Sequence, residues 1–392
     1  MWLPGRITSA FLSAACAIAV AACTAPAASA PPPTPSSVPA WSHIGLTSVS
    51  CTSARSCVAV GAAAVSQARM LPVAEIWNGH RWLGQRVPGP AGTTRLARQL
   101  TGVSCSGPSR CVAVGHTTTA TGDVSFADSW NGTRWRLLPL SYPTGSTELT
   151  GVSCRASMCV LTGFYLTGGQ LLPLTFELDG TAQRRLTPAI PRGQGGATLV
   201  GVWCATPSAC MTVGHYEPAQ GQGTANLAEE WDGSRWHVLK TASPAGTANG
   251  PGLVAVSCPT TALCLAVGSY YDVSRPGRPF AVREIWQHDQ WRMLHPSGPG
   301  PQRFTPAAVA CQSSSNCMAV GGSASLSAVS GFPGAEQWTG GSFRYLPIPH
   351  PQAGSLTAIS CTSGRMCLAV GRGATAFAEL WNGSSWQLLS IP

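Results

Sequence analysis

Cysteine is the residue type with the most regular spacing in this sequence. Fourteen of the 16 cysteines form seven pairs, six of which enclose five residues, whereas the third encloses four. The pairs are Cys51/Cys57, Cys105/Cys111, Cys154/Cys159, Cys204/Cys210, Cys258/Cys264, Cys311/Cys317 and Cys361/Cys367. A structural zinc site built on these cysteines would need four cysteine or histidine ligands around one ion, and no histidine recurs beside the pairs. We therefore predict seven disulfides, each within one repeat, and no metal site.

A carboxylate stands two residues before a recurring tryptophan in six places: Glu75, Asp128, Glu229, Glu284, Glu336 and Glu379. Most of these tryptophans open a Trp-Asn-Gly or Trp-Asp-Gly turn that leads to a second tryptophan. The acid–base pair of an enzyme would occur once, not in six repeats. We expect each carboxylate to accept a hydrogen bond from a backbone amide or an arginine between repeats. The tryptophan pairs are expected to pack inside the fold rather than stack on a sugar.

More varied chemistry follows the strand-ending glycine of the third, fourth and fifth repeats. These segments contain four of the six tyrosines of the chain. Phenol rings beside carboxylate and guanidinium groups form an amphipathic surface that suits sugars or peptide side chains. The predicted ligand-binding residues are Tyr165, His215, Tyr216, Glu217, Tyr270, Tyr271, Asp272 and Arg275. Packing of these loops against themselves is the alternative, and no residue is assigned a catalytic role.

Each repeat is predicted to form four short strands that position these groups. Residue type alternates with a period of two along Leu100–Cys105, which predicts the first strand, and Cys111–Gly115 predicts the second. Asn-Gly turns between later apolar segments are typical of β-hairpins. No segment has a sustained helical period, and one four-stranded unit cannot bury both of its faces. Seven units spaced 49–54 residues apart predict an all-β, seven-bladed β-propeller. Both hairpins of a blade should lie on one face of the ring and the variable loops on the other. The ring should close by packing of faces rather than by a strand shared between its ends.

This pattern resembles two families of propeller. An inner strand, a second strand ending in glycine, an aromatic residue and a later tryptophan are similar to kelch-type repeats, and Gly321-Gly322 reproduces the kelch double glycine. Asp232-Gly233-Ser234-Arg235-Trp236 resembles the Asp-box of sialidase-like propellers. These resemblances imply a propeller over Leu46–Pro392. They carry no catalytic residue over to this chain.

The N-terminal segment has the features of an export signal. Arg6 precedes the apolar run Ile7–Ala22, which is short and rich in small residues for a membrane span. The run ends in Val20-Ala21-Ala22-Cys23, which resembles the lipobox of bacterial lipoproteins and implies that Cys23 is lipidated. The expected organisation is a signal peptide (1–22), a lipidated cysteine with a Pro/Ala/Ser-rich tether (23–45) and the propeller (46–392). Plain secretion with cleavage after Ala28-Ser29-Ala30 is the alternative.

Composition narrows the functional classes. The net charge of +9 comes from scattered arginines, because Lys240 is the only lysine, and this argues against a nucleic-acid partner. We expect a monomeric, extracytoplasmic module without a cofactor, anchored to the membrane by its lipid. It would bind a glycan, a peptide or a protein, or act as a scaffold. A glycan-active hydrolase or lyase of the sialidase-like propeller type is the alternative.

Overall fold

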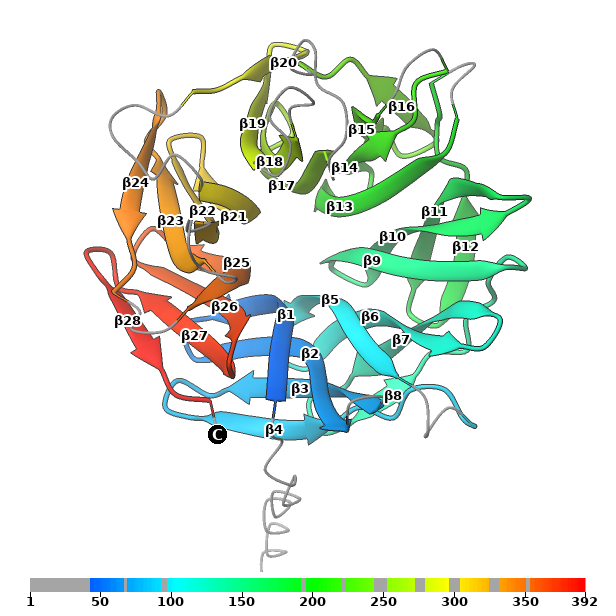
Figure 1. Ribbon diagram of the computed structural model, residues 1–392, viewed down its shortest axis with the longest axis horizontal. Helices are drawn as coiled ribbons and strands as arrows, with labels where there is room; N and C mark the ends of the chain where they lie inside the picture. Colours follow the sequence, from blue (N-terminus) through cyan, green and yellow to red (C-terminus); the bar gives the residue numbers. More distant parts are fainter. Residues whose placement is uncertain are drawn as a thin grey trace, which may run out of the picture. The chain divides into compact units, whose positions relative to one another are not determined.

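The repeats fold into seven antiparallel sheets of four strands each, arranged as blades around a common centre (Figure 1). The computed structural model describes residues 43–66, 69–92, 97–191, 195–219, 223–242, 252–271, 279–295, 304–323, 331–349 and 353–391. All of them belong to the second of two units into which the chain divides, Met1–Pro35 and Ser36–Pro392. The all-β, seven-bladed propeller is therefore confirmed.

Each blade consists of four consecutive strands, ordered from the centre outward (Figure 1). The innermost strands are β1 (His43–Ser53), β5 (Arg98–Gly107), β9 (Ser146–Arg155), β13 (Ala197–Thr206), β17 (Gly252–Thr260), β21 (Phe304–Ser313) and β25 (Gly354–Ser363). The second strands are β2 (Ser56–Ser66), β6 (Arg110–Thr119), β10 (Met158–Thr167), β14 (Ala209–Tyr216), β18 (Leu263–Tyr271), β22 (Asn316–Ser323) and β26 (Met366–Gly373). The third strands are β3 (Arg69–Trp77), β7 (Gly122–Trp130), β11 (Gln170–Asp179), β15 (Ala225–Trp231), β19 (Pro279–Gln287), β23 (Phe332–Trp338) and β27 (Ala376–Trp381). The outermost strands are β4 (Trp82–Arg86), β8 (Trp135–Leu137), β12 (Ala182–Leu186), β16 (Trp236–Leu239), β20 (Gln290–Met293), β24 (Phe343–Pro347) and β28 (Trp386–Leu389).

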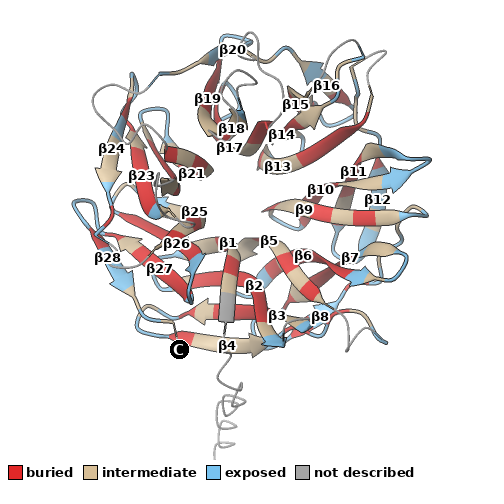
Figure 2. Ribbon diagram, in the orientation of Figure 1, coloured by how far each residue is buried: buried red, intermediate tan, exposed pale blue. Residues whose placement is uncertain are grey.

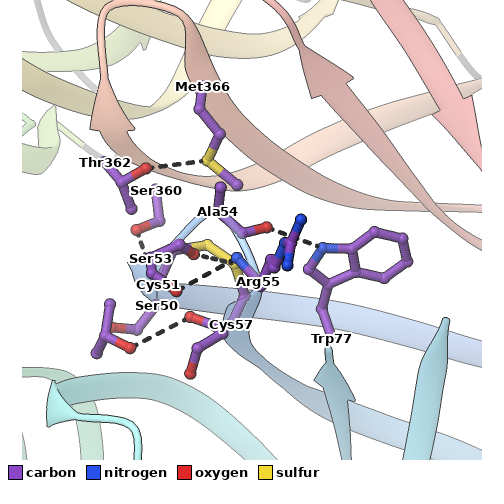
Figure 3. The surroundings of a disulfide bond; sticks show 12 residues. Ser50, Cys51, Ser53, Ala54, Arg55, Cys57, Trp77, Ser360, Thr362 and Met366 are labelled. Atoms are coloured by element: carbon purple, nitrogen blue, oxygen red, sulfur yellow. Dashed lines mark hydrogen bonds between the residues drawn. A yellow bond between two sulfur atoms is a disulfide. The ribbon is translucent and has the colours of Figure 1, made fainter. Parts of the chain in front are cut away.

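The two sequence markers of a repeat lie in one row across the blade. In the first blade Cys51 is paired with Cys57, which is opposite Trp77, and Trp77 is opposite Trp82. The two indole rings are 5.4 Å apart, and Trp77 Nε1 donates to the carbonyl of Ala54 in the cysteine hairpin at 3.2 Å (Figure 3). The tryptophans therefore pack inside the blade, as predicted.

All seven cysteine pairs form disulfides within their own blades, with Cα atoms 3.9–4.0 Å apart. The shorter pair of the third blade, Cys154–Cys159, is joined by a tight turn in which Ala156 has a φ of 51°. The other six blades have one more residue and an irregular register at this point. Seven disulfides indicate an oxidising, extracytoplasmic environment.

The second cysteine of each pair lies in the core rather than at the surface of the ring, which the spacing of the pairs did not indicate. Cys317 is 0% exposed and packs between the fifth and sixth blades, and Cys367 is 1% exposed and packs between the sixth and seventh. The second cysteines of the other five blades are also buried: Cys57, Cys111, Cys159, Cys210 and Cys264. Cys317 and Cys367 are therefore structural residues of the blade interfaces and do not belong to a surface site.

The glycine four residues after the second cysteine of each pair is required by a close approach of the first two strands. In the first blade the register shifts between Leu46 and Ser48, so that Thr47 bulges out of the pairing. A Cβ on Gly61 would overlap the backbone of Gly45 on the inner strand. Equivalent overlaps occur at Gly115, Gly163, Gly214, Gly268, Gly321 and Gly371. The bulge thus explains why every repeat has glycine at this position.

Two rows of hydrogen bonds join the inner strands of neighbouring blades. The bulged threonine donates its hydroxyl to a carbonyl of the next blade, in the pairs Thr47–Leu100 (2.7 Å), Thr101–Leu149 (2.6 Å), Thr150–Leu199 (2.8 Å) and Thr357–Leu46 (2.7 Å). The serine before the first cysteine accepts from the next blade's cysteine N–H, in the pairs Ser50–Cys105 (3.0 Å), Ser104–Cys154 (2.9 Å), Ser153–Cys204 (2.9 Å), Ser257–Cys311 (3.0 Å) and Ser360–Cys51 (2.9 Å).

The ring closes between the seventh blade and the first without a shared strand. Thr357 and Ser360 make the same two hydrogen bonds across this boundary that other blades make, and Figure 3 shows Ser360 beside Cys51. The apolar residues Leu46, Ala63, Leu368 and Val370 pack together there. Closure by packing of faces is therefore confirmed. Similar apolar layers between blades form the core, and Figure 2 shows buried residues concentrated in the middle of the strands.

In the part of the chain that the structure describes, no helix has the length and apolar character needed to cross a lipid bilayer. Strand β1 begins at His43, so the predicted start of the propeller at residue 46 lies inside this strand.

Candidate functional site

The antiparallel order gives the ring two chemically different faces. The disulfide face carries the cysteine hairpins and the hairpins between third and fourth strands. We call the opposite face the loop face. It carries the connections between blades and those that follow Ser66, Thr119, Thr167, Tyr216, Tyr271, Ser323 and Gly373. Loops on a rigid scaffold commonly carry function, so the candidate site is sought on this face.

The six recurring carboxylates are buried, with exposed fractions of 0–4%. Three of them bond to the preceding blade. Glu336 accepts two hydrogen bonds of 2.6 Å from Arg283, and Glu229 accepts one of 2.9 Å from the backbone N–H of Ala189. Glu284 accepts from the Ala242 N–H at 3.0 Å and from the Asn226 amide at 2.7 Å. These three confirm the predicted role between blades.

The other three carboxylates have fewer partners. Both oxygens of Asp128 and one oxygen each of Glu75 and Glu379 are buried without a hydrogen bond to any described residue. Burial raises the pKa of Glu75, Asp128 and Glu379 to about 7, and that of Glu229 to about 8. Because these groups lie between blades, their titration affects stability rather than a ligand on the surface.

Tyr165, Tyr216 and Tyr270 lie at equivalent positions near the loop face, and all three are partly buried. Tyr165 packs against the core between the second and third blades, and the Arg185 guanidinium lies 5.1 Å from its ring centre. Tyr270 stacks on Phe280, with ring centres 5.4 Å apart and an angle of 21°. Tyr271, the next residue, is exposed. Packing within the blade thus accounts for a large part of the Tyr165 and Tyr270 surfaces.

The remaining predicted residues are distributed between the blade interface and the loops. His215 lies beside Gly252 of the fifth blade, and the Thr198 hydroxyl is 3.1 Å from its Nε2. Tyr216 is partly buried against a small cluster in its own blade. The backbone of Glu217 is paired with that of Gly195 and Gly196, and its side chain is exposed. Asp272 and Arg275 lie outside the described residues.

Exposed apolar side chains collect on the loop face, which the sequence reasoning missed. Nine large apolar residues in the described part of the chain are exposed, and five of them lie where second strands end or third strands begin. These five, here called the apolar rim, are Val65, Val124, Leu166, Tyr271 and Phe332, each on a different blade. Phe332 is 49% exposed and Tyr271 40%, and their blades are neighbours in the ring. The other four exposed apolar residues lie on outermost strands or beside them.

Comparison with known proteins identifies the fold. No protein-family model and no curated protein sequence matches the chain. One similar solved structure is the β-propeller domain of the Trilobed protease from Pyrococcus furiosus, which has an open velcro topology; the TM-score is 0.54 at 8% identity, over 89% of this chain and 98% of that chain. Another is the GH74 xyloglucanase from Xanthomonas campestris, with a TM-score of 0.53 at 13% identity, over 90% of this chain and 55% of that chain. The similarity is to the fold alone.

Proposed function

We propose that this protein is a non-catalytic binding module of the cell envelope, which holds a peptide or protein segment on its loop face. The observation that carries the proposal is the apolar rim. Exposed apolar side chains from five blades lie at the connections between second and third strands on one face, where a bound segment could contact several of them. The rim includes Tyr271 of the predicted ligand site.

The burial of the six recurring carboxylates favours a binding function over a hydrolytic one. A glycosidase of the usual kind needs two carboxyl groups beside the scissile bond. The six recurring carboxylates are buried, and three of them bond to a neighbouring blade. Of the predicted ligand-binding residues that the structure describes, only Glu217 supplies a carboxylate. A glycan-active hydrolase is the second candidate function, because the fold is shared with a xyloglucanase.

The disulfides and the N-terminal sequence both support the proposed location of the module. The seven disulfides favour an extracytoplasmic compartment, and the Val20-Ala21-Ala22-Cys23 motif supports lipidation of Cys23. A Pro/Ala/Ser-rich tether that precedes strand β1 would then hold the propeller away from the membrane. This organisation suits a receptor or scaffold that meets its ligand at the cell surface.

The test uses the oxidised protein and a phage library of random peptides. Selected peptides should bind the wild type and lose at least about tenfold in affinity with Phe332→Ser or Tyr271→Ser, since central aromatic contacts dominate such interfaces. The matched controls are Leu388→Ser and Val238→Ser, because these residues are 48% and 39% exposed but lie on outermost strands. Peptides that respond equally to all four variants would contradict the loop-face site. Turnover of xyloglucan or chromogenic glycosides would favour the hydrolase.

A further inference from the structure

Three potential metal ligands meet between the second and third blades, close to the loop face. They are His116 on β6, Asp123 on β7 and Glu148 on β9. One ligand atom from each lies within 4.8 Å of the other two, and His116 Nδ1 is 3.7 Å from Glu148 Oε1. The three residues come from three strands of two blades.

The cluster contains polar atoms without hydrogen bonds. His116 is 6% exposed, and its Nδ1 has no hydrogen-bond partner among the described residues. Asp123 Oδ1 is likewise buried without a partner. Burial raises the pKa of the Glu148 carboxyl, the nearby Asp123 raises it further, and His116 opposes the shift. A cation between these atoms would satisfy them all.

The other nitrogen of the imidazole is already held by a neighbouring amide. Gln99 Nε2 lies 2.8 Å from His116 Nε2. If the Gln99 amide turns over, its oxygen accepts the Nε2–H, and the lone pair of Nδ1 then points into the cluster. A second partner of this kind is the usual way in which proteins orient a metal-ligating histidine.

The corresponding place in another blade shows what is special about this interface. His215 has the position in the fourth blade that His116 has in the second, because each directly follows the recurring glycine of the second strand, Gly214 or Gly115. The neighbour from the next blade is Gly252 there and Glu148 here. The recurring carboxylate Glu284 bonds across that interface, whereas Phe176 replaces it in the third blade. The interface between the second and third blades therefore lacks the recurring carboxylate of the third blade and has the cluster instead.

We propose that His116, Asp123 and Glu148 bind one divalent transition-metal ion, zinc in the first instance. One imidazole nitrogen and two carboxylate oxygens suit zinc, with bond lengths of about 2.0–2.2 Å. Tetrahedral zinc separates such ligand atoms by about 3.4 Å, so a modest side-chain movement closes the site. Three protein ligands leave a fourth position for water. The ion would link the second blade to the third, independently of the proposed ligand on the apolar rim.

The test is zinc titration of the full oxidised chain after treatment with a chelator. Calorimetry should show about one zinc ion per chain, with an increase in the melting temperature, because the ion binds the folded state. Asp123→Asn and Glu148→Gln should each weaken zinc binding by at least about tenfold. The control His215→Gln changes the equivalent histidine and should leave zinc binding unchanged. His237→Gln controls for the exposed His237–Asp232 pair, whose atoms are 2.7 Å apart.

Each outcome decides the proposal. Loss of zinc binding in both carboxylate variants, with native near-ultraviolet circular dichroism, supports the site. Wild-type binding that both variants retain would overturn it, as would loss of binding in His237→Gln. Absence of zinc binding by the wild type would also overturn it. Equal responses to magnesium or calcium would overturn the assignment to a transition metal, since those ions prefer sites made of oxygen ligands.

Discussion

Arg283 of the fifth blade donates two hydrogen bonds of 2.6 Å, from Nε and Nη2, to the two carboxylate oxygens of Glu336 in the sixth blade. Both side chains are buried. A paired guanidinium and carboxylate satisfy each other in this dry interface, but either alone would be an uncompensated charge. Glu336, one of the carboxylates that recur in the sequence, thus holds the sixth blade to the fifth.

Removal of the Arg283 side chain should therefore destabilise the folded protein. Arg283→Met is expected to lower the free energy of unfolding by about 3–5 kcal/mol. Arg184→Met is the matched control, because Arg184 pairs with Glu177 at 2.7 Å but its side chain is 57% exposed. That change should cost less than about 1 kcal/mol. Urea unfolding measures both, and equal losses would show that the buried pair has no special role.

Stability should fall as the pH rises from 5 to 8.5. Burial raises the pKa of Glu75, Asp128, Glu229 and Glu379 in the folded state, whereas in the unfolded chain such groups titrate near about 4. The folded state thus holds more protons, and the stability present below pH of about 4 is lost as pH rises through about 7 to 8. Melting temperatures across this range test the direction.

A substitution separates this effect from general charge. Glu229→Gln removes one of the buried ionisations and should make the melting temperature less dependent on pH. Asp179→Asn changes an exposed carboxylate in the third blade and should leave the profile unchanged. A wild-type protein that becomes more stable toward pH 8.5 would contradict the prediction.

The tight turn of the third blade offers a stabilising change. Ala156 has a φ of 51°, a region that costs an L-residue with a side chain about 1 kcal/mol and costs glycine little. Ala156→Gly is expected to raise the free energy of unfolding by about 0.5–1 kcal/mol. Ala54→Gly in the first-blade hairpin is the control, since no positive φ is found there. A gain at both positions, or at neither, would point away from backbone strain.

The serine–cysteine hydrogen bond between the seventh and first blades should contribute as much to stability as the equivalent bond between the first and second blades. Ser360→Ala and Ser50→Ala each remove the acceptor of one cysteine N–H, at 2.9 and 3.0 Å. Each is expected to lower the free energy of unfolding by about 1–3 kcal/mol. Hydrogen exchange at Cys51 and Cys105 measures the local effect. A much larger global loss for Ser360→Ala would identify the closing boundary as the weak point of the ring.

Adjacent tyrosines of the fifth blade should behave differently. Tyr270→Ala removes a ring stacked on Phe280 and should lower the melting temperature by several degrees. Tyr271→Ala changes an exposed side chain and should leave the melting temperature almost unchanged. Thermal unfolding of the two variants decides the point. The reverse order would make Tyr270 the ligand contact and Tyr271 the packing residue.

The architecture could be predicted because the same markers recur along the chain. Paired cysteines and a glycine four residues after the second cysteine occur in all seven repeats, the carboxylate before tryptophan occurs in six, and the structure places them at equivalent positions. The partner of each carboxylate differs between blades, so the sequence indicated its role without naming Arg283 or Ala189. The disulfides of Cys317 with Cys311 and of Cys367 with Cys361 could be predicted in the same way. The burial of Cys317 and Cys367 between blades could not, because it depends on the neighbouring blade. Recurrence is thus a strong signal for packing.

Unique features of single blades could not be found in this way. His116, Asp123 and Glu148 occur together at only one interface of the described blades, and they meet because the second and third blades pack side by side. Val65 and Phe332 are apolar residues of β-strands, a type that is usually buried. The sequence alone therefore did not distinguish them from core residues, although they are exposed in the structure. The stacking of Tyr270 on Phe280 depends on hairpin register across a long connection. These contacts are set by three-dimensional packing, for which the sequence has no local marker.

The closure of the ring has a consequence for how such a protein can be rearranged. Each blade is one continuous stretch of chain with its own disulfide, and no strand is borrowed across a boundary. The blade at which the coding sequence starts is therefore separable from the arrangement of the blades in space. A circularly permuted gene that starts at any blade would encode the same set of interfaces. Duplication or loss of one coding block would add or remove one whole blade, which gives a simple evolutionary route between rings of different size.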